Sequence, residues 1–171
     1  MMRIYQTGLL LFALMLSACM AIAPTAQVDA GAAGQAEDAV FVIRHLQKAS
    51  GDDPVLTSEG AANAQRLAEM LAGKNITAIY STRTRRTMQT GEPLARRLGL
   101  TIIPYDPYDP EALVEVVRAG EGSVLVVGHS NTVGGLVTRF GGNTAPELTE
   151  QDYGSLFMVD ADGDVHEFTV E

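Results

Sequence analysis

Two of the chain's three histidines stand directly after short apolar segments. Residues 39–43 are Ala-Val-Phe-Val-Ile and lead into Arg44-His45, and residues 123–128 lead into His129. Short apolar runs of this kind predict strands that are buried on both faces. A single such histidine is usually a core or loop residue. If the two strands are parallel neighbours, however, both imidazoles lie at the carboxyl edge of one sheet, where α/β proteins bind their ligands.

Three arginines follow another predicted strand, residues 76–80: Arg83, Arg85 and Arg86. Such a run is most often a solvated basic helix face. This one would share the sheet edge with the two histidines and could therefore bind a multiply charged anion. Arginine suits phosphate because its planar fork donates two parallel hydrogen bonds and stays charged. Ser130 opens the next predicted helix, whose free N–H groups would add to the same site.

The chain is acidic overall, with a formal net charge of −9 at pH 7 over 171 residues. This charge argues against nonspecific binding to nucleic acid through a basic surface. The sequence also lacks a His, Asp and Cys cluster at metal-ligand spacing, and we expect neither a metal nor a cofactor. The length and the hydrophobic content of 46% fit one domain with a single core.

Predicted strands alternate with predicted helices from Ala39 onward. The strands are residues 39–43, 76–80, 100–104, 123–128, 156–160 and 165–170. The helices, with their caps, are residues 57–73, 84–98, 109–120 and 129–141. This alternation predicts a three-layer α/β/α sandwich with a mainly parallel sheet. Asp162-Gly163, between the last two strands, predicts a C-terminal antiparallel hairpin.

Capping residues define several helix ends. Asp109 followed by Pro110 predicts a helix start. Gly73 fits the C-terminal cap of the first helix. We expect the helix over residues 84–98 to be broken or kinked near Gly91-Glu92-Pro93, because proline removes a backbone donor.

The N-terminus has the pattern of an export signal. Arg3 precedes an apolar stretch, residues 8–16, that is too short for a convincing transmembrane helix. The stretch ends in Leu16-Ser17-Ala18-Cys19, which looks like a bacterial lipoprotein cleavage box. Two alternatives stay open: ordinary signal-peptidase cleavage after Ala23 or Ala26, and an incidental cysteine.

The lipoprotein interpretation divides the chain into three parts. Residues 1–18 are the signal peptide, residues 19–38 are a flexible tether of small and polar residues, and residues 39–171 are the folded domain. A lipid on Cys19 would anchor the protein to a membrane of the bacterial cell envelope, facing the periplasm or the exterior. Mass spectrometry of the mature N-terminus tests this, because an unmodified end downstream of Cys19 excludes it.

Four short motifs occur in order along the predicted domain. They are Val42-Ile43-Arg44-His45, Leu56-Thr57 with Gly60, Tyr80-Ser81 with Arg86 and Thr90, and Val127-Gly128-His129-Ser130. Together they resemble the histidine phosphatase superfamily, the phosphoglycerate-mutase-like group named for its Arg-His-Gly motif. The resemblance covers the chain from Ala39 to the C-terminus, and the short chain resembles the small bacterial phosphatases of the group.

The resemblance implies a role for each matching residue. His45 falls on the nucleophilic histidine, and Arg44 and Arg86 fall on the phosphate-binding arginines. His129 falls on the second histidine, which in its protonated form would help to neutralise charge on the phosphoryl oxygens. Ser130, directly after it, is a further candidate phosphate ligand.

The sequence departs from the family pattern at three places. Leu46 replaces a small glycine or alanine, which bears on the width of the pocket. Arg83-Thr84 replaces Pro-Leu, so Arg83 is either an extra phosphate contact or a surface charge. Thr87 takes the place of an alanine.

The implied function is hydrolysis of a phosphomonoester, on a small molecule or a phosphoprotein, through a phosphohistidine on His45. The proton donor would be Asp106, because Asp109 already caps a helix. One alternative is a non-catalytic phosphate-binding or interaction module, although such a module needs no nucleophile. Another is a phosphoglycerate-mutase-type phosphotransferase, which the short chain and the export signal argue against.

Overall fold

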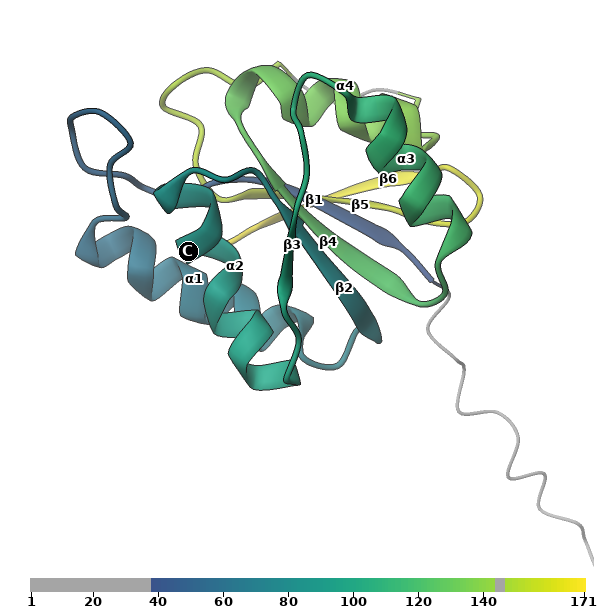
Figure 1. The fold of residues 1–171 in the computed structure, drawn as a ribbon, viewed down its shortest axis with the longest axis horizontal. Coiled ribbons are helices and arrows are strands. Elements are labelled where there is room, and N and C mark those ends of the chain that lie inside the picture. The colour runs from purple at the N-terminus through teal and green to yellow at the C-terminus, as the bar shows by residue number, and fades with distance from the viewer. Residues whose placement is uncertain (1–37, 144–146) are drawn as a thin grey trace, which may run out of the picture. The chain divides into compact units, whose positions relative to one another are not determined.

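The computed structural model describes residues 38–143 and 147–171 (Figure 1). In chain order its elements are β1 (Val40–Arg44), α1 (Ser58–Leu71), β2 (Ile76–Ser81), α2 (Arg85–Leu98), β3 (Ile102–Pro104), α3 (Pro110–Ala119), β4 (Ser123–Gly128), α4 (Ser130–Phe140), β5 (Ser155–Val159) and β6 (Val165–Thr169). The predicted signal peptide 1–18, the predicted lipidation site Cys19 and the predicted tether as far as residue 37 lie outside the described residues. Within the part described, no helix has the length and apolar character needed to cross a membrane.

The strands form one sheet in the order β3-β2-β4-β1-β5-β6. The parallel pairs are β3 with β2, β2 with β4, and β4 with β1. β5 pairs antiparallel with both β1 and β6. The prediction of a mainly parallel sheet with a C-terminal hairpin is therefore confirmed. Arg44 pairs with Gly128 across β1 and β4, and the His45 N–H donates to the Gly128 carbonyl oxygen at 3.0 Å. The two histidines consequently follow adjacent parallel strands.

Helices cover both faces of the sheet, with α1 and α2 on one face and α3 and α4 on the other (Figure 1). Phe41 and Ile43 of β1 pack in the core with α1 and α2. Val42, between them, packs in the second core with α3 and α4. This alternation explains why β1 is apolar along its whole length, since both of its faces are buried. The predicted three-layer sandwich is confirmed.

Of the predicted break or kink in α2, the break is wrong. The helix runs from Arg85 to Leu98 with Pro93 inside it. Its buried residues pack against the sheet, and a β-carbon on Gly91 would lie 3.2 Å from Cγ2 of Ile79 in β2. This close packing on the sheet outweighs the backbone hydrogen bond that proline removes.

Two element ends also differ from the prediction. The cap of α1 is Ala72, in right-handed conformation, and the left-handed residue before β2 is Asn75 (φ 52°) rather than Gly73. A left-handed glycine is not needed at position 73 to end the helix, because Lys74 continues the turn. Its N–H donates to the Leu71 carbonyl oxygen at 3.0 Å. The third strand begins at Ile102 rather than residue 100, because the chain first leaves α2 through the left-handed Gly99.

Gly60 allows α1 to lie against the backbone of the loop that follows His45. A β-carbon on Gly60 would collide with the carbonyl oxygen of Gln47, whereas one on Gly73 would meet nothing within 4 Å. We predict that Gly60→Ala lowers the free energy of unfolding by about 1–3 kcal/mol, the usual cost of overpacking. The matched control Gly73→Ala should change it by no more than about 0.5 kcal/mol. Urea denaturation of both variants measures the difference, and equal stabilities would contradict the prediction.

Candidate active site

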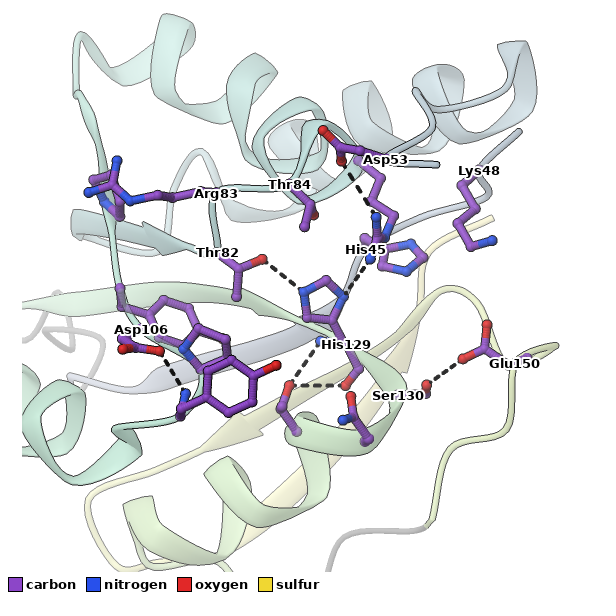
Figure 2. Close-up of a pocket in the computed structure, with 17 residues that line it drawn as sticks. His45, Lys48, Asp53, Thr82, Arg83, Thr84, Asp106, His129, Ser130 and Glu150 are labelled. Carbon is purple, nitrogen blue, oxygen red and sulfur yellow. Dashed lines mark hydrogen bonds and ion pairs between the residues drawn. The ribbon is translucent and has the colours of Figure 1, made fainter. Parts of the chain in front are cut away.

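The two histidines that follow β1 and β4 lie side by side at the carboxyl edge of the sheet. The ring centroids of His45 and His129 are 5.6 Å apart, with the rings inclined edge to face at 67°. Both residues line a pocket of about 1120 Å³, and Figure 2 shows His129 in its middle. A parallel pair of strands thus brings together side chains that are 84 positions apart in sequence, as the apolar runs predict.

His45 is held as a neutral imidazole with one nitrogen free. Its Nδ1 lies 2.9 Å from the Leu46 carbonyl oxygen. A carbonyl only accepts, so the proton is on Nδ1 and the lone pair is on Nε2. Burial, together with the nearby Arg44 and Arg86 guanidiniums, lowers the pKa of His45 to about 4, against the opposing effect of the Leu46 hydrogen bond. His45 therefore carries an unprotonated Nε2 at neutral pH.

His129 is neutral as well in the free protein. Burial lowers the pKa of His129 to about 4, and the guanidiniums of Arg86 and Arg44 act in the same direction. Its Nδ1 accepts a long hydrogen bond of 3.5 Å from Arg86 Nη2. The ring proton is therefore on Nε2, which donates to the Thr82 hydroxyl oxygen at 2.9 Å.

A chain of threonine hydroxyls supports His129 from behind. Thr82 Oγ1 lies 2.9 Å from Thr87 Oγ1, and the Thr87 hydroxyl is within 2.9 Å of the carbonyl oxygens of Thr82 and Thr84. Thr87, which stands where the family pattern has alanine, is fully buried. Its hydroxyl fixes Thr82 and through it the orientation of the second histidine.

Arg86 projects from the first turn of α2 into the pocket. Its Nη1 lies 3.6 Å from the Asp53 carboxylate on the loop after β1. Its Nε–H is buried and has no hydrogen-bond partner among the described residues. A buried donor without a partner is costly, and an anion in the pocket would satisfy it.

Arg44 is the most enclosed of the predicted residues, with only 1% of the residue exposed. Its Nη1 donates to the carbonyl oxygens of Thr149 at 2.6 Å and Asp152 at 3.1 Å. The guanidinium stacks on the Tyr153 ring, 4.3 Å from the centroid. Arg44 is thus held by the segment before β5 and does not line the pocket, although its charge acts on both histidines.

Ser130, at the start of α4, lines the pocket as predicted. Its hydroxyl donates to Glu150 Oε1 at 2.8 Å, and Glu150 Oε2 accepts from Arg44 Nη2 at 3.2 Å. The hydrogen bond from Ser130 and the charge of Arg44 lower the pKa of the Glu150 carboxyl. A carboxylate of the protein therefore lies on two of the predicted phosphate ligands.

The remaining candidates lie farther from the histidines. Arg83 and Asp106 line the pocket on the side of His129 opposite Glu150 (Figure 2). The Asp106 carboxylate accepts the Tyr108 N–H at 2.9 Å, as in an ordinary turn. Asp109 caps α3 by accepting the Ala112 N–H at 3.3 Å, as expected.

The structure answers the question raised by Leu46. This side chain is fully buried in the core with α1 and α2 and does not line the pocket. The larger residue therefore does not narrow the site. Among the described residues, no group of three His, Cys, Asp or Glu is placed to bind a metal ion.

Several residues of the site were missed by sequence reasoning. Thr82 follows the end of β2, and its position after a strand was a usable signal. Asp53 and Glu150 belong to loops that approach the arginines from distant parts of the chain. Tyr153 gave no signal at all, because its stacking on Arg44 depends on the path of the segment before β5.

Two neutral imidazoles and two guanidiniums are thus gathered at the carboxyl edge of the parallel strands, the edge where α/β proteins bind their ligands. Residues 40–107 match the histidine phosphatase superfamily (branch 1). Over this range the chain is similar to that superfamily. The matched range contains Arg44, His45 and Arg86, and His129 lies beyond it. No curated protein matches the chain in sequence.

Solved structures with the same fold include phosphatases. The protein histidine phosphatase SixA, solved in complex with tungstate, is 25% identical with a TM-score of 0.59, and the match covers 76% of this chain and 94% of that one. SixA from Agrobacterium tumefaciens is 22% identical, with a TM-score of 0.56 and coverages of 76% and 95%. Mycobacterial glucosyl-3-phosphoglycerate phosphatase with inorganic phosphate is 17% identical, with a TM-score of 0.58 and coverages of 77% and 95%. The matches to SixA from Agrobacterium tumefaciens and to the mycobacterial phosphatase support the fold alone, because their identities are only 22% and 17%.

The two buried histidines make a prediction about stability and pH. Both have a pKa of about 4 in the folded protein against 6.5 for the free side chain. Between these values the unfolded chain binds more protons, so stability falls as the pH falls from 6.5 towards 4. We predict a loss of about 2–4 kcal/mol in the free energy of unfolding between pH 7 and pH 5. Urea denaturation at both pH values measures it, and a variant with His45→Gln and His129→Gln should lose much less. The same loss in both proteins would contradict this origin.

Proposed function

We propose that the protein is a phosphatase that hydrolyses a phosphomonoester through a phosphohistidine on His45. The observation that carries the proposal is the tautomer of His45. Its Nδ1 proton is bound to the Leu46 carbonyl oxygen at 2.9 Å, which leaves the Nε2 lone pair unprotonated in the pocket. A buried neutral imidazole beside two guanidiniums is suited to attack an anionic phosphoryl group.

In the first step, His45 Nε2 attacks phosphorus, the bond from phosphorus to the ester oxygen breaks, and the alcohol leaves with a proton from Asp106. The ring becomes a phosphorylated imidazolium, and the Leu46 carbonyl oxygen stabilises its positive charge through Nδ1–H. In the second step, water attacks the same phosphorus and gives a proton back to the Asp106 carboxylate, the phosphorus–nitrogen bond breaks and inorganic phosphate leaves. The ring is then neutral again.

Arg86 and Arg44 would stabilise the charge on the phosphoryl oxygens, which is the main requirement in phosphoryl transfer. Both carry a buried Nε–H with no partner among the described residues. A bound dianion would also raise the pKa of His129, so that its Nδ1 takes up a proton and donates to a phosphoryl oxygen. Protonated His129 is in this way a property of the complex rather than of the free protein.

The substrate is proposed as a class. The SixA match is named a protein histidine phosphatase and the mycobacterial match a glucosyl-3-phosphoglycerate phosphatase, so both phosphoproteins and small phosphomonoesters belong in a substrate panel. The pocket of about 1120 Å³ has room for either a phosphorylated side chain or a small molecule. We propose that the reaction proceeds without a metal, which activity in the presence of EDTA would test. Lipid anchoring at Cys19 remains a separate proposal, supported by the sequence pattern.

The nucleophile is tested by trapping the phosphoenzyme. Rapid quench with ³²P-labelled substrate should give an acid-labile, base-stable label on His45, and His45→Ala should reduce turnover by about a thousandfold or more. His166→Ala is the matched control, because His166 lies on β6 outside the pocket with half of its side chain exposed. The control should keep full activity. Turnover by His45→Ala at the wild-type rate would exclude the mechanism.

The proton donor is tested by the choice of leaving group. Asp106 lines the pocket and is the proposed general acid. An alkoxide leaving group needs a proton, whereas p-nitrophenolate scarcely needs one. We predict that Asp106→Asn slows hydrolysis of alkyl phosphates by roughly a hundredfold and that of p-nitrophenyl phosphate far less. Equal losses on both substrates would indicate a positioning role instead, and no loss would remove Asp106 from the site.

A further inference from the structure

Glu150 is an exposed residue whose carboxylate nevertheless reaches the buried part of the site. Its side chain is 70% exposed, yet Oε1 accepts from the Ser130 hydroxyl at 2.8 Å and Oε2 from Arg44 Nη2 at 3.2 Å. Figure 2 shows it at the rim of the pocket, joined to Ser130. A surface carboxylate thus contacts Arg44, which the proposed function assigns to phosphate, and Ser130, a phosphate ligand predicted from the sequence.

Arg44 is held in place by groups other than the Glu150 side chain. Nη1 is bound by the backbone carbonyl oxygens of Thr149 and Asp152, and the guanidinium stacks on Tyr153. These contacts fix the guanidinium without any help from the Glu150 side chain. Glu150 is therefore not required to position Arg44.

The free edge of the guanidinium is only partly used. Nε and Nη2 of Arg44 lie on one edge, where a bidentate anion would bind. Glu150 makes a single bond there, to Nη2, while Nε has no partner among the described residues. A phosphoryl group has an oxygen for each donor and a second negative charge, so it can replace the carboxylate with a net gain in contacts.

We propose that Glu150 is an internal competitor for the phosphate site, which occupies Arg44 and Ser130 in the free protein and is displaced by the phosphoryl group of the substrate. This inference rests on the proposed function. The carboxylate returns after hydrolysis and competes with inorganic phosphate, the product. Because it opposes substrate and product alike, Glu150 sets the affinity of the site and limits product inhibition.

The test compares two substitutions that remove the same charge from the same segment. Glu150→Gln removes the competing charge at Arg44. Glu147→Gln is the matched control, because Glu147 forms no hydrogen bond or ion pair with Arg44 or Ser130 in the described part of the chain. Glu150 is mostly exposed, so its substitution should leave the fold intact, and circular dichroism checks this.

Inorganic phosphate is the probe, titrated into the full chain at pH 8 by isothermal calorimetry. Glu150→Gln should bind phosphate about tenfold more tightly than the wild type, as expected for removing one charge that competes at the surface. Glu147→Gln should match the wild type. In steady-state kinetics with p-nitrophenyl phosphate, KM and the phosphate inhibition constant should fall together in Glu150→Gln, and kcat should not rise, since only uniform binding changes.

Unchanged or weaker phosphate binding by Glu150→Gln would overturn the inference. If the wild type still bound phosphate and hydrolysed substrate, the proposed function would stand on its own. Tighter binding by Glu147→Gln to the same extent would also overturn the inference, because the effect would then be one of general charge. A wild type that bound no phosphate and hydrolysed no phosphomonoester would overturn both.

Discussion

The parallel pairing of β1 with β4 is the constraint on which the rest of the site depends. Arg44 lies opposite Gly128 in this pair, so the next residue of each strand is a histidine at the same edge. A slip of one residue would turn β1 over relative to β4 and exchange the two faces on which its side chains pack. The cores on the two sides of the sheet oppose such a slip, because Phe41 and Val42 pack into different ones. Packing of the interior therefore sets the distance between the two imidazoles.

The electrostatics of the site follow from this burial. Loss of water disfavours the protonated form of each imidazole, and the two neighbouring guanidiniums repel its positive charge as well. Both histidines are consequently neutral, with pKa values of about 4. The arrangement keeps both imidazoles unprotonated on one nitrogen and leaves the guanidiniums of Arg44 and Arg86 as the positive charges beside them. The protein has a net charge of −9. The two guanidiniums therefore attract anions locally, which the net charge alone does not indicate.

Most of the fold was predictable because its signals are local. The Asp109-Pro110 cap and the glycine after residue 119 defined α3, and the apolar run 123–128 defined β4. Pro93 led to the wrong prediction of a break in α2. A proline in the sequence indicates the lost hydrogen bond but not the packing that compensates for it. The site was predictable where residues end strands, as His45 and His129 do.

The parts of the site that were missed depend on tertiary structure. The charge of His129 could not be derived from its position, because it depends on burial and on guanidiniums from two other elements. The contact of Glu150 with Arg44 joins residues 106 positions apart, and Glu150 lies in residues 147–154, outside any helix or strand. No spacing rule predicts such a contact. The sequence therefore indicated the arginines that the fold brings to this edge of the sheet but gave no sign of the carboxylate that contacts Arg44.

The anchoring of Arg44 has a further consequence for binding. A free arginine side chain loses conformational freedom when it binds an anion, and that loss reduces affinity. Arg44 has already lost it, because backbone carbonyl oxygens and the Tyr153 ring hold its guanidinium before any ligand arrives. A site fixed in advance stabilises developing charge effectively, but it also risks binding the product too tightly. A carboxylate of the protein that competes for the same edge would offset that risk, and an exposed side chain such as Glu150 has the room to leave and return within each turnover.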